Sequence, residues 1–384
     1  MSLVLDEHRQ YLADLSRIEA FRLAIHEVVK PGDVVLDLAS GTGILGLLAC
    51  KAGAERVYSI EVGPMIGLAH EISKANGFAD RTTFIKGLSS HVNLPQRVDV
   101  VVADQIGNFG FNAGILEYFN DARERFLKPG GAMIPSCMEL YVAPVNCPTI
   151  FDNIEFWNRS PAGFEFGPAR TIAANTGYQV KFHSEDLMGE PVRLTSIDLS
   201  TATEVPIVVN SSVTIERNGT LHGIGGWFTA SLSRNVSISN SPLAEYPIER
   251  RQVFFPIDRP VSVSKGDCVQ IRMQILPHDL VVNWTITVVK SAPNQTSADR
   301  AVTFRHSTWK GMLFCNEDLE RTRPVSIPRL SPRGLGRLSV LELCDGQKSL
   351  SEIEKEVYRR HPALFGSLDE AAVFVAEVVT RYSL

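Results

Sequence analysis

The chain has 384 residues, of which 44% are hydrophobic, and its formal net charge at pH 7 is -5. This length predicts two or three domains with a substantial core, and the mildly acidic charge argues against nucleic acid as a partner. The six cysteines include no Cys-x-x-Cys pair, which argues against a zinc site or a disulfide framework and favours a reducing compartment. With no signal peptide and no apolar stretch of membrane-spanning length, we expect a cytoplasmic protein without membrane contact.

The first 137 residues predict an α/β domain. Residues 1–30 show a helical pattern that becomes more apolar along the chain, and the run Lys128–Gly131 is expected to end the last helix of the domain. Between them, strands near 34–38, 56–61, 82–86, 98–104 and 132–135 alternate with helices near 44–53, 64–75 and 112–127. This alternation is typical of a doubly wound, Rossmann-like parallel sheet, which binds its ligands at the carboxyl ends of the strands.

A loop of small residues follows the first strand of this sheet. Asp37 ends the strand, and small side chains from Ala39 to Gly43 would let a ligand approach the backbone at the next helix. The spacing of Ala39, Gly41 and Gly43 differs from the three-glycine dinucleotide pattern, and Asp37 would repel a phosphate. The loop therefore suits the amino group of S-adenosylmethionine, a cation that binds with no phosphate nearby.

The second strand ends in Glu61, which is placed to accept hydrogen bonds from both hydroxyls of a ribose. The loop, this acidic residue and the strand–helix alternation together predict nucleoside binding. The alternative is an ordinary turn between strand and helix, with Asp37 solvated.

Beyond Met138 the pattern changes to short β-branched segments that alternate in polarity, which predicts an antiparallel barrel or sandwich. A segment rich in arginine and proline follows, and it is either a solvated tether or a segment that docks to an acidic site. Three short helices end the chain, and two begin with capping boxes, Ser349 with Glu352 and Ser367 with Glu370. We expect a cofactor-binding domain at 1–137, a barrel at 138–300, a linker at 301–337 and a helical module at 338–384.

Residues 1 to about 300 resemble the protein arginine methyltransferases, which couple a nucleotide-binding sheet to a β-barrel. The family's first helical motif appears here as His8, Leu12, Asp14, Arg17, Phe21, Ala24 and Ile25. Residues 35–45 match the loop motif of the family, apart from Ala39, where glycine is usual. The resemblance implies a class I methyltransferase fold, S-adenosylmethionine as cofactor and S-adenosylhomocysteine as product.

The resemblance also implies roles for single residues. Arg17 would bind the cofactor carboxylate, since an arginine fork matches a carboxylate, and His8 would lie beside the methionine part. The adenine would meet Leu88, Ser89 or Ser90 after the third strand. The cofactor-binding residues expected from loop and resemblance are His8, Arg17, Asp37, Ala39, Gly41, Gly43, Ile44, Leu45, Glu61, Val62, Leu88, Ser89, Ser90 and Asp104.

The acceptor site departs from the family pattern. The family holds a substrate guanidinium between two glutamates after the fourth strand; Asp104 replaces the first and Ala113 the second. Glu117 can substitute for the missing carboxylate or lie solvated on a helix. The family's threonine–histidine–tryptophan loop aligns with residues 247–249, so its histidine is absent, and Glu245 or Glu249 can bring a carboxylate back. We expect Asp104 and Glu249 to be catalytic; a neutral or less strongly charged acceptor would tolerate Ala113 better than a guanidinium.

The last segment, from Leu338 onward, resembles the small PqqD-type modules, winged-helix-like units that bind leader peptides of ribosomally made natural products. The alternative is a generic three-helix appendage that packs on the barrel or on another subunit. The family also forms dimers through a helical arm on the barrel. Residues 146–185 lie where an arm can be inserted, although no long helix is evident there, so a homodimer is expected by analogy alone.

Two functions follow from these patterns. The first is methyl transfer to a nitrogen or oxygen of an arginine, a peptide, a small molecule or a natural-product precursor, with Asp104 orienting the acceptor or accepting its proton. The alternative is a catalytically weak scaffold that retains the cofactor or its product and presents a peptide through the C-terminal module.

Overall fold

The computed structural model describes residues 4–203, 206–291, 301–313, 315–321 and 323–382. The chain divides into two compact units, Met1–Met312 and Leu313–Leu384. In the described ranges, no helix is long and apolar enough to cross a membrane.

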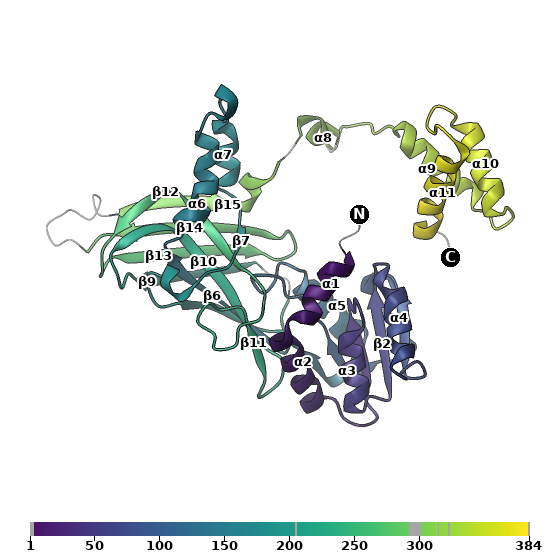
Figure 1. Ribbon diagram of the computed structural model, residues 1–384, viewed down its shortest axis with the longest axis horizontal. Coiled ribbons are helices and arrows are strands. Elements are labelled where there is room, and N and C mark those ends of the chain that lie inside the picture. Colours follow the sequence, from purple (N-terminus) through teal and green to yellow (C-terminus); the bar gives the residue numbers. More distant parts are fainter. Residues whose placement is uncertain (1–3, 204–205, 292–300, 314, 322, 383–384) are drawn as a thin grey trace. The chain divides into compact units, whose positions relative to one another are not determined.

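A five-stranded parallel sheet with the order β3-β2-β1-β4-β5 forms the centre of the first domain (Figure 1). Its strands are β1 (Val34–Leu38), β2 (Arg56–Glu61), β3 (Thr82–Lys86), β4 (Val98–Val102) and β5 (Leu127–Ile134), and its helices are α3 (Ile44–Ala52), α4 (Met65–Ala75) and α5 (Ile115–Arg125). The predicted Rossmann-like sheet is confirmed. Residues 128–131, expected to end a helix, instead lie within β5, where the register with β4 shifts between Val98 and Val100.

The N-terminal helical segment is broken into α1 (Val4–Ala13) and α2 (Leu15–Val28). Asp14 separates them: its side chain caps α2 by accepting a hydrogen bond from the backbone N–H of Arg17 at 3.1 Å. The buried side chains of Phe21, Ala24 and Ile25 join α2 to the core of the parallel sheet. The break lets α1 leave the sheet at an angle to α2.

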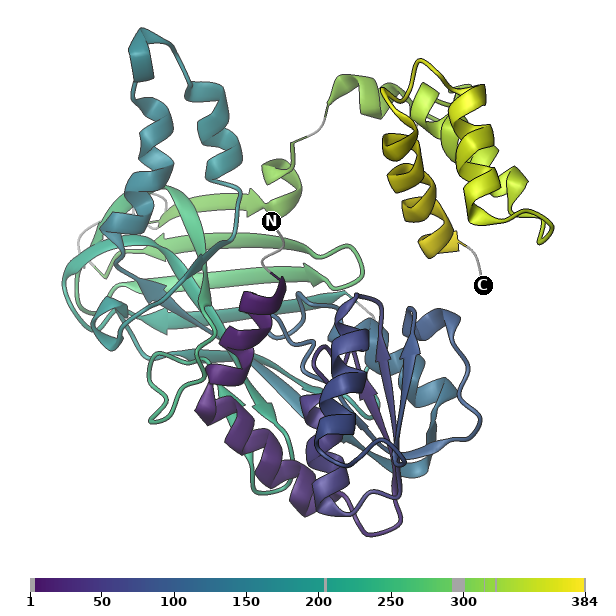
Figure 2. The same ribbon diagram turned by 45° about the vertical axis from the view of Figure 1, so that its right-hand side comes forward.

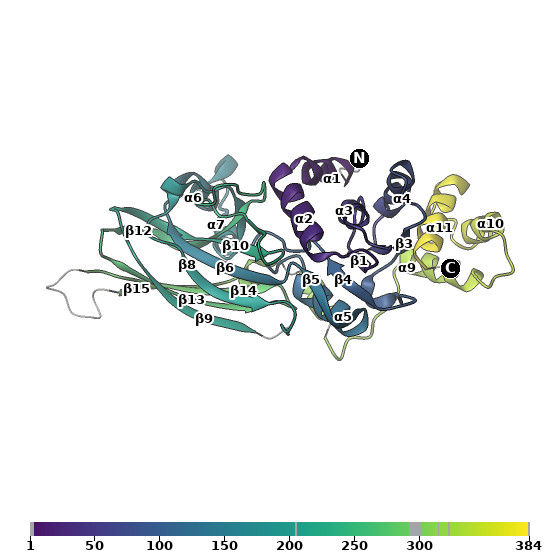
Figure 3. The ribbon, with the colours of Figure 1, turned by 90° about the horizontal axis from the view of Figure 1, so that it is seen from below.

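Two antiparallel sheets form the second domain (Figure 3). The larger contains β6 (Cys137–Val145), β7 (Tyr178–Val180), β8 (Val192–Asp198), β10 (Gly219–Ser231), β11 (Ser237–Ser239) and β12 (Gln252–Val263), and the smaller contains β9 (Ile207–Thr214), β13 (Cys268–Leu276), β14 (Val281–Val289) and β15 (Ala301–Ser307). The ring of Phe255 lies 5.3 Å from that of Trp284, whose indole N–H donates to the Pro256 carbonyl at 2.8 Å. These contacts join the sheets across a shared core, and the predicted antiparallel architecture is confirmed.

The expected linker is shorter than predicted at both ends. Residues 301–307 form β15 and pair with β14, because Phe304 and His306 alternate with exposed residues and are buried against the sheet. The helix α9 (Pro332–Leu343) begins six residues before the expected module, where the Ser331 hydroxyl accepts from the Gly334 N–H at 3.1 Å. Residues 301–307 therefore belong to a strand and residues 332–337 to a capped helix, although both were expected in the linker.

The second unit consists of α8 (Asn316–Arg321), α9, α10 (Leu350–Arg360) and α11 (Leu368–Tyr382). Its core contains Val340, Leu343, Ile353, Val357, Phe365, Ala371, Phe374, Val375 and Val378. Ser349 and Glu352 form both bonds of a capping box, whereas Glu370 accepts from the Gly366 N–H rather than from that of Ser367. Its described residues form no strand, so the winged-helix-like interpretation stays a prediction.

A helical projection is inserted between β6 and β7. It comprises α6 (Pro148–Glu155) and α7 (Gly167–Ala173), which lie side by side and extend away from the antiparallel sheet (Figure 2). Near its tip, Phe164 is 69% exposed, and Phe156 and Phe166 are also exposed. The expected absence of a long helix agrees with this structure, since the projection is built from two short ones.

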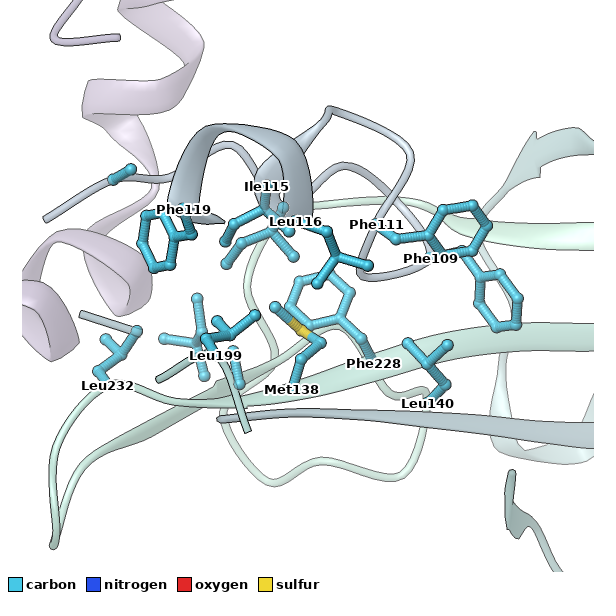
Figure 4. Packing of buried hydrophobic residues seen from close by; sticks show 14 of the residues in the cluster. Phe109, Phe111, Ile115, Leu116, Phe119, Met138, Leu140, Leu199, Phe228 and Leu232 are labelled. Atoms are coloured by element: carbon cyan, nitrogen blue, oxygen red, sulfur yellow. The ribbon is translucent and has the colours of Figure 1, made fainter. Parts of the chain in front are cut away.

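A continuous apolar core joins the two domains of the first unit. Phe109 and Phe111, from the loop after β4, and Ile115, Leu116 and Phe119, from the start of α5, pack against Met138, Leu140, Leu199, Phe228 and Leu232 (Figure 4). The loop that carries Asp104 is therefore held between the parallel and the antiparallel sheets.

Candidate active site

Two adjoining cavities lie at the carboxyl ends of β1, β2 and β4. The first, of about 240 Å³, is lined by residues that include His8, Arg17, Gly41, Ile44, Leu45 and Asp104. The second, of about 110 Å³, is lined mainly by apolar groups, among them Leu38, Ile60, Val62 and Leu88, and also by Ser89. Ala39, Glu61 and Gln105 line both. The structure thus gathers most of the expected cofactor residues around one two-part site.

Three of the expected cofactor residues line neither cavity. Gly43 caps α3 with a φ of 76°, and Ser90 is exposed beside the site. Asp37 is fully buried beneath the loop, so its side chain does not face either cavity. The direct contact of Asp37 with a cofactor amino group stays a prediction: the side chain lines neither cavity, and its Oδ1 has no hydrogen-bond partner among the described residues.

The loop between β1 and α3 has a left-handed backbone at three positions. The φ angles are 55° at Ala39, 53° at Gly41 and 76° at Gly43. A Cβ atom at Gly41 would lie 2.6 Å from Cε1 of His8, so a larger residue would need the His8 ring to move as well as a left-handed backbone. Ala39 adopts the same unfavourable region with a side chain, which explains why glycine is usual at its position.

Glu61 lies where the two cavities meet, and backbone amides fix its carboxylate. Oε2 accepts from the Gly41 N–H at 3.0 Å and Oε1 from the Gly63 N–H at 2.6 Å. The carboxylate keeps further lone pairs for other donors. This position fits the expected hydrogen bonds to ribose hydroxyls.

Asp37 has an unusual carboxyl group. Its Oδ2 accepts from the Gly46 N–H at 2.8 Å, while Oδ1 has no partner among the described residues. Burial raises the pKa of Asp37 to about 7; the bond from Gly46 opposes this rise and the nearby charge of Glu61 adds to it. Asp37 therefore positions α3 from below the loop.

The residues at this site fit the expected cofactor. In the described part of the chain, buried side-chain atoms without a hydrogen-bond partner occur on four residues: Asp37, Ser40, Asp104 and His306. The first three belong to this loop and site, and such orphaned atoms commonly mark a missing ligand or water. A cavity with Arg17 and Glu61 beside a smaller apolar one matches a molecule with an amino-acid part, a ribose and a flat base.

Asp104 lies between two guanidinium groups. Its Oδ2 accepts from Nε of Arg17 at 2.8 Å and from a terminal nitrogen of Arg250 at 3.0 Å. The three side chains are only 7–13% exposed, and Oδ1 of Asp104 has no partner among the described residues. One carboxylate thus faces two cations in a poorly hydrated place, which leaves an excess positive charge.

A network of amide side chains fixes the loop that carries Asp104. Oδ1 of Asn112 accepts from the N–H groups of Asn108 and Phe109, both at 2.9 Å. The side-chain amide of Asn108 donates to the Arg251 carbonyl at 3.0 Å, and that of the buried Asn240 donates to the carbonyls of Asn108 and Arg251 at 2.9 Å. The segment before β12 is therefore bound to this loop, and Arg250 is held against Asp104.

A third and larger cavity, of about 870 Å³, lies between α1 and the antiparallel domain. It shares Tyr11, Arg17, Asn108 and Arg250 with the 240 Å³ cavity, so these four residues form the boundary between the two. Its charged lining comprises Arg9, Arg17, Lys181, Arg250 and Arg251 as cations and Asp14, Glu185 and Glu249 as acids. An acceptor in this cavity would meet the cofactor site at Arg250.

The structure does not bring Glu249 to Asp104. The Glu249 side chain is 71% exposed and pairs with Lys181 at 3.2 Å, and it lines only the 870 Å³ cavity. Ala113 lines the 240 Å³ cavity as expected, whereas Glu117 faces a separate cavity and Glu245 is exposed. None of these three glutamates replaces the second carboxylate of the family pattern here.

Sequence reasoning missed Arg250 and Gln105. Arg250 carries no local signal, because its role comes from a contact with Asp104 across 146 positions of the chain. Gln105 directly follows Asp104 at the end of β4, and a position at a strand's carboxyl end could have identified it.

The two halves of the first unit match known methyltransferase families. Residues 137–287 match the arginine methyltransferase oligomerization subdomain, and residues 22–138 match the ribosomal protein L11 methyltransferase (PrmA) family. Protein arginine N-methyltransferase 6 of Xenopus tropicalis is 29% identical over 288 residues, which cover 71% of this chain and 84% of that protein. Protein arginine N-methyltransferase 1 of Chlamydomonas reinhardtii is 29% identical over 280 residues, 71% of this chain and 81% of that protein.

Solved structures share the fold. The Trypanosoma brucei PRMT1 enzyme–prozyme heterotetrameric complex with AdoHcy superimposes with a TM-score of 0.69 at 22% identity, over 78% of this chain and 97% of that chain. Protein arginine methyltransferase 10 of Arabidopsis thaliana superimposes with a TM-score of 0.67 at 21% identity, over 79% of this chain and 98% of that chain. The sequence matches and the site together identify the chain as an S-adenosylmethionine-dependent methyltransferase that resembles the protein arginine methyltransferases.

Proposed function

We propose that this enzyme methylates a nitrogen or oxygen nucleophile of an arginine, a peptide or a natural-product precursor, next to Asp104. The observation that supports this proposal is the position of Asp104 between Arg17 and Arg250, the two arginines that line both the cofactor cavity and the large cavity. S-adenosylmethionine supplies a methyl group on a positively charged sulfur, an excellent leaving group. The protein then has to align an acceptor and exclude water.

The proposed binding roles follow from the contacts of each residue. Arg17 keeps N–H donors beyond its bonds to Asp104 and to the Tyr11 carbonyl, and these can hold the cofactor carboxylate. Glu61 is placed for the ribose, and Val62, Leu88 and Ser89 for the base. Asp104 orients the acceptor, directly through its free Oδ1 where the acceptor carries an N–H or O–H group and otherwise by holding Arg250 in place.

The large cavity is proposed as the acceptor site. Its 870 Å³ are enough for several residues of a peptide or for a sizeable small molecule, and it opens onto the Asp104 pair at Arg250. Tyr11 and Asn108 complete the boundary that an acceptor group must pass.

We also propose that the second unit, Leu313–Leu384, binds a peptide. Its helix α9 exposes Leu335, Leu338 and Leu341 at helical spacing on one face, although its opposite face is packed in the core of the unit. An exposed apolar stripe of this kind suits an amphipathic or extended peptide. A homodimer is proposed on the aromatic tip of the α6–α7 projection, which lies within the segment that matches the oligomerization subdomain.

The dimer is tested by mass measurement in solution. Replacing Phe164 and Phe166 together with alanine should shift a dimer to a monomer, because both are exposed at the tip. Leu280, which is 49% exposed elsewhere, gives a matched control as Leu280→Ala. A dimer unaffected by the Phe164/Phe166 change would contradict the role of the projection.

The methyl transfer itself is tested with methyl-labelled S-adenosylmethionine and pools of peptides, small metabolites and free arginine. We expect label on an acceptor, and loss of label with Asp104→Asn. Tight cofactor binding without any transferred label would contradict this proposal and favour the scaffold alternative.

A further inference from the structure

The charges around Asp104 are already paired within the protein. Asp104 accepts from both Arg17 and Arg250 through one oxygen, and both Glu61 oxygens accept from backbone amides. The remaining position of the family's acceptor loop is Ala113, which has no charge. Asp104, the carboxylate that Arg250 contacts at the boundary with the large cavity, is therefore already engaged by two guanidinium groups.

A guanidinium acceptor would fit this site poorly. It would be the third guanidinium beside Asp104, and the cofactor carboxylate proposed for Arg17 would offset only one of the other two. The side chains of that cluster are almost excluded from solvent. Like charges repel most strongly where water does not screen them. The carboxylate of Glu249, which could have compensated, is exposed and paired with Lys181.

We propose that the methyl acceptor is a carboxylate and that Arg250 is the residue that selects it. This inference rests on the methyl transfer proposed above and specifies its substrate class. Among its contacts with described residues, the Arg250 guanidinium donates to Asp104 and, at 3.4 Å, to the Gly107 carbonyl, so N–H donors remain for a ligand. A planar fork that lines both cavities can hold one carboxylate oxygen while the other faces the methyl group.

The reaction balances without a general base. A carboxylate oxygen of the acceptor forms the bond to the methyl carbon, the methyl–sulfur bond breaks, and its electron pair stays on sulfur. The products are a neutral methyl ester and a neutral thioether, and no proton is released at neutral pH. An acceptor of this class thus explains why Ala113 and an exposed Glu249 are compatible with activity, whereas a nitrogen acceptor would need a group to take up its proton.

The lining of the large cavity also favours an acidic acceptor. Five basic side chains and three acidic ones line it. Both oxygens of Asp14 are engaged by the N–H groups of Arg17 and Glu249, which leaves this carboxylate less able to attract a cation. Lys181 is paired with Glu249 and Arg9 with Asp6, so Arg251 is the lining cation that adds to Arg250 on the route of an acidic acceptor.

The test measures the stability of the transferred label to alkali. Methyl esters release methanol in base, whereas N-methyl groups do not. The full chain is incubated with methyl-labelled S-adenosylmethionine and four pools of acceptors. The first contains peptides rich in aspartate and glutamate, and the second contains the same peptides with asparagine and glutamine in their place and an amidated C-terminus. The third contains arginine-rich peptide amides, and the fourth is an extract of the source organism. Cofactor affinity is measured by calorimetry for each variant.

We expect base-labile label in the acidic peptides or the extract and not in the amidated peptides. Arg250→Gln should lower it by about tenfold or more, the usual effect of losing a charge-assisted bidentate bond, with Arg250→Lys in between. Arg259→Gln, on an exposed part of β12 outside the cavities, is the matched control and should behave as wild type.

Two results would overturn the inference and leave the proposed methyl transfer intact: base-stable label on arginine peptides or on another nitrogen acceptor, and base-labile label that Arg250→Gln and Arg250→Lys leave unchanged. Absence of label in all four pools, with cofactor bound, would instead contradict the proposed function as well.

Discussion

At the scale of single residues, Asp37 carries an electrostatic cost that depends on pH. Its folded-state pKa of about 7 lies above its ordinary value of 3.8 because burial disfavours the charged form. Between these two pH values the folded chain holds a proton that the unfolded chain releases. The free energy of unfolding should therefore fall as pH rises from about 4 to about 7.

Asp37→Asn tests this dependence. The amide can keep the bond from the Gly46 N–H and carries no charge, so the variant should equal wild type at about pH 3, below both pKa values, and be more stable at pH 8. The gain at pH 8 should be on the order of 4 kcal/mol, from a shift of about three pKa units at about 1.4 kcal/mol each. Urea denaturation at several pH values measures it, and parallel pH profiles for the two proteins would refute the raised pKa.

Ala39 should be a site of backbone strain that a single change relieves. Its φ of 55° lies in the left-handed region, where a Cβ atom is unfavourable. Ala39→Gly is expected to raise the free energy of unfolding by about 1 kcal/mol, measured by chemical denaturation. Gly130→Ala, at φ 76° with no atom near the added Cβ, reverses the change and should lose a similar amount. A destabilised Ala39→Gly would show that the loop holds no such strain.

At the scale of elements, α3 is positioned by the close approach of Gly46 to β1 and β2. A Cβ atom there would lie 2.9 Å from Cγ1 of Val57 and 3.1 Å from Oδ2 of Asp37. Gly46→Ala should therefore destabilise the protein by about 1–3 kcal/mol through overpacking, although alanine favours helices. Because α3 carries the cofactor loop, cofactor affinity should fall as well.

The matched change is Gly67→Ala in α4, where no atom lies within 4 Å of the added Cβ. Alanine should here stabilise the helix by up to about 1 kcal/mol. Thermal denaturation and cofactor titration of both variants separate helix propensity from packing. Equal effects at the two positions would contradict the importance of the α3 contact.

Element boundaries show which local signals were strong. Continuous apolar runs predicted β1, β2 and β4 well, because these strands are largely buried on both faces of the sheet. The helix before residues 128–131 ends at Arg125, as their proline and glycines suggest, but the residues themselves lie in β5 at its irregular register with β4, between the pairs Val98–Leu127 and Val100–Ala132. The strand β15 was missed because it is stabilised by pairing with β14, and its own short sequence carries only a weak strand signal.

At the scale of the whole molecule, the two compact units have separate cores. Phe374 is buried in the second unit, 5.1 Å from the Phe365 ring and beneath the Arg333 guanidinium. Phe374→Ala should destabilise that unit by about 3–5 kcal/mol, as expected for a large cavity in a small core. Cofactor affinity, which depends on the first unit, should stay unchanged.

Hydrogen exchange along α10 and α11 measures this local loss, and calorimetry measures cofactor binding. Val373→Ala, at a neighbouring position that is 72% exposed, serves as the control and should change neither. A loss of cofactor affinity in Phe374→Ala would show that the two units fold as one.

The sequence by itself determined the parallel sheet, the antiparallel region and the cofactor loop, because these depend on periodicity and on residues close together in the chain. It also located Asp104, Arg17 and Glu61, which stand at the ends of strands or in a helical motif. Only the tertiary structure decided what Asp104 does: it meets Arg17 across 87 positions and Arg250 across 146. Such pairing depends on how two domains pack, and no local pattern records it. The same packing placed Glu249 with Lys181, away from the carboxylate it was expected to assist.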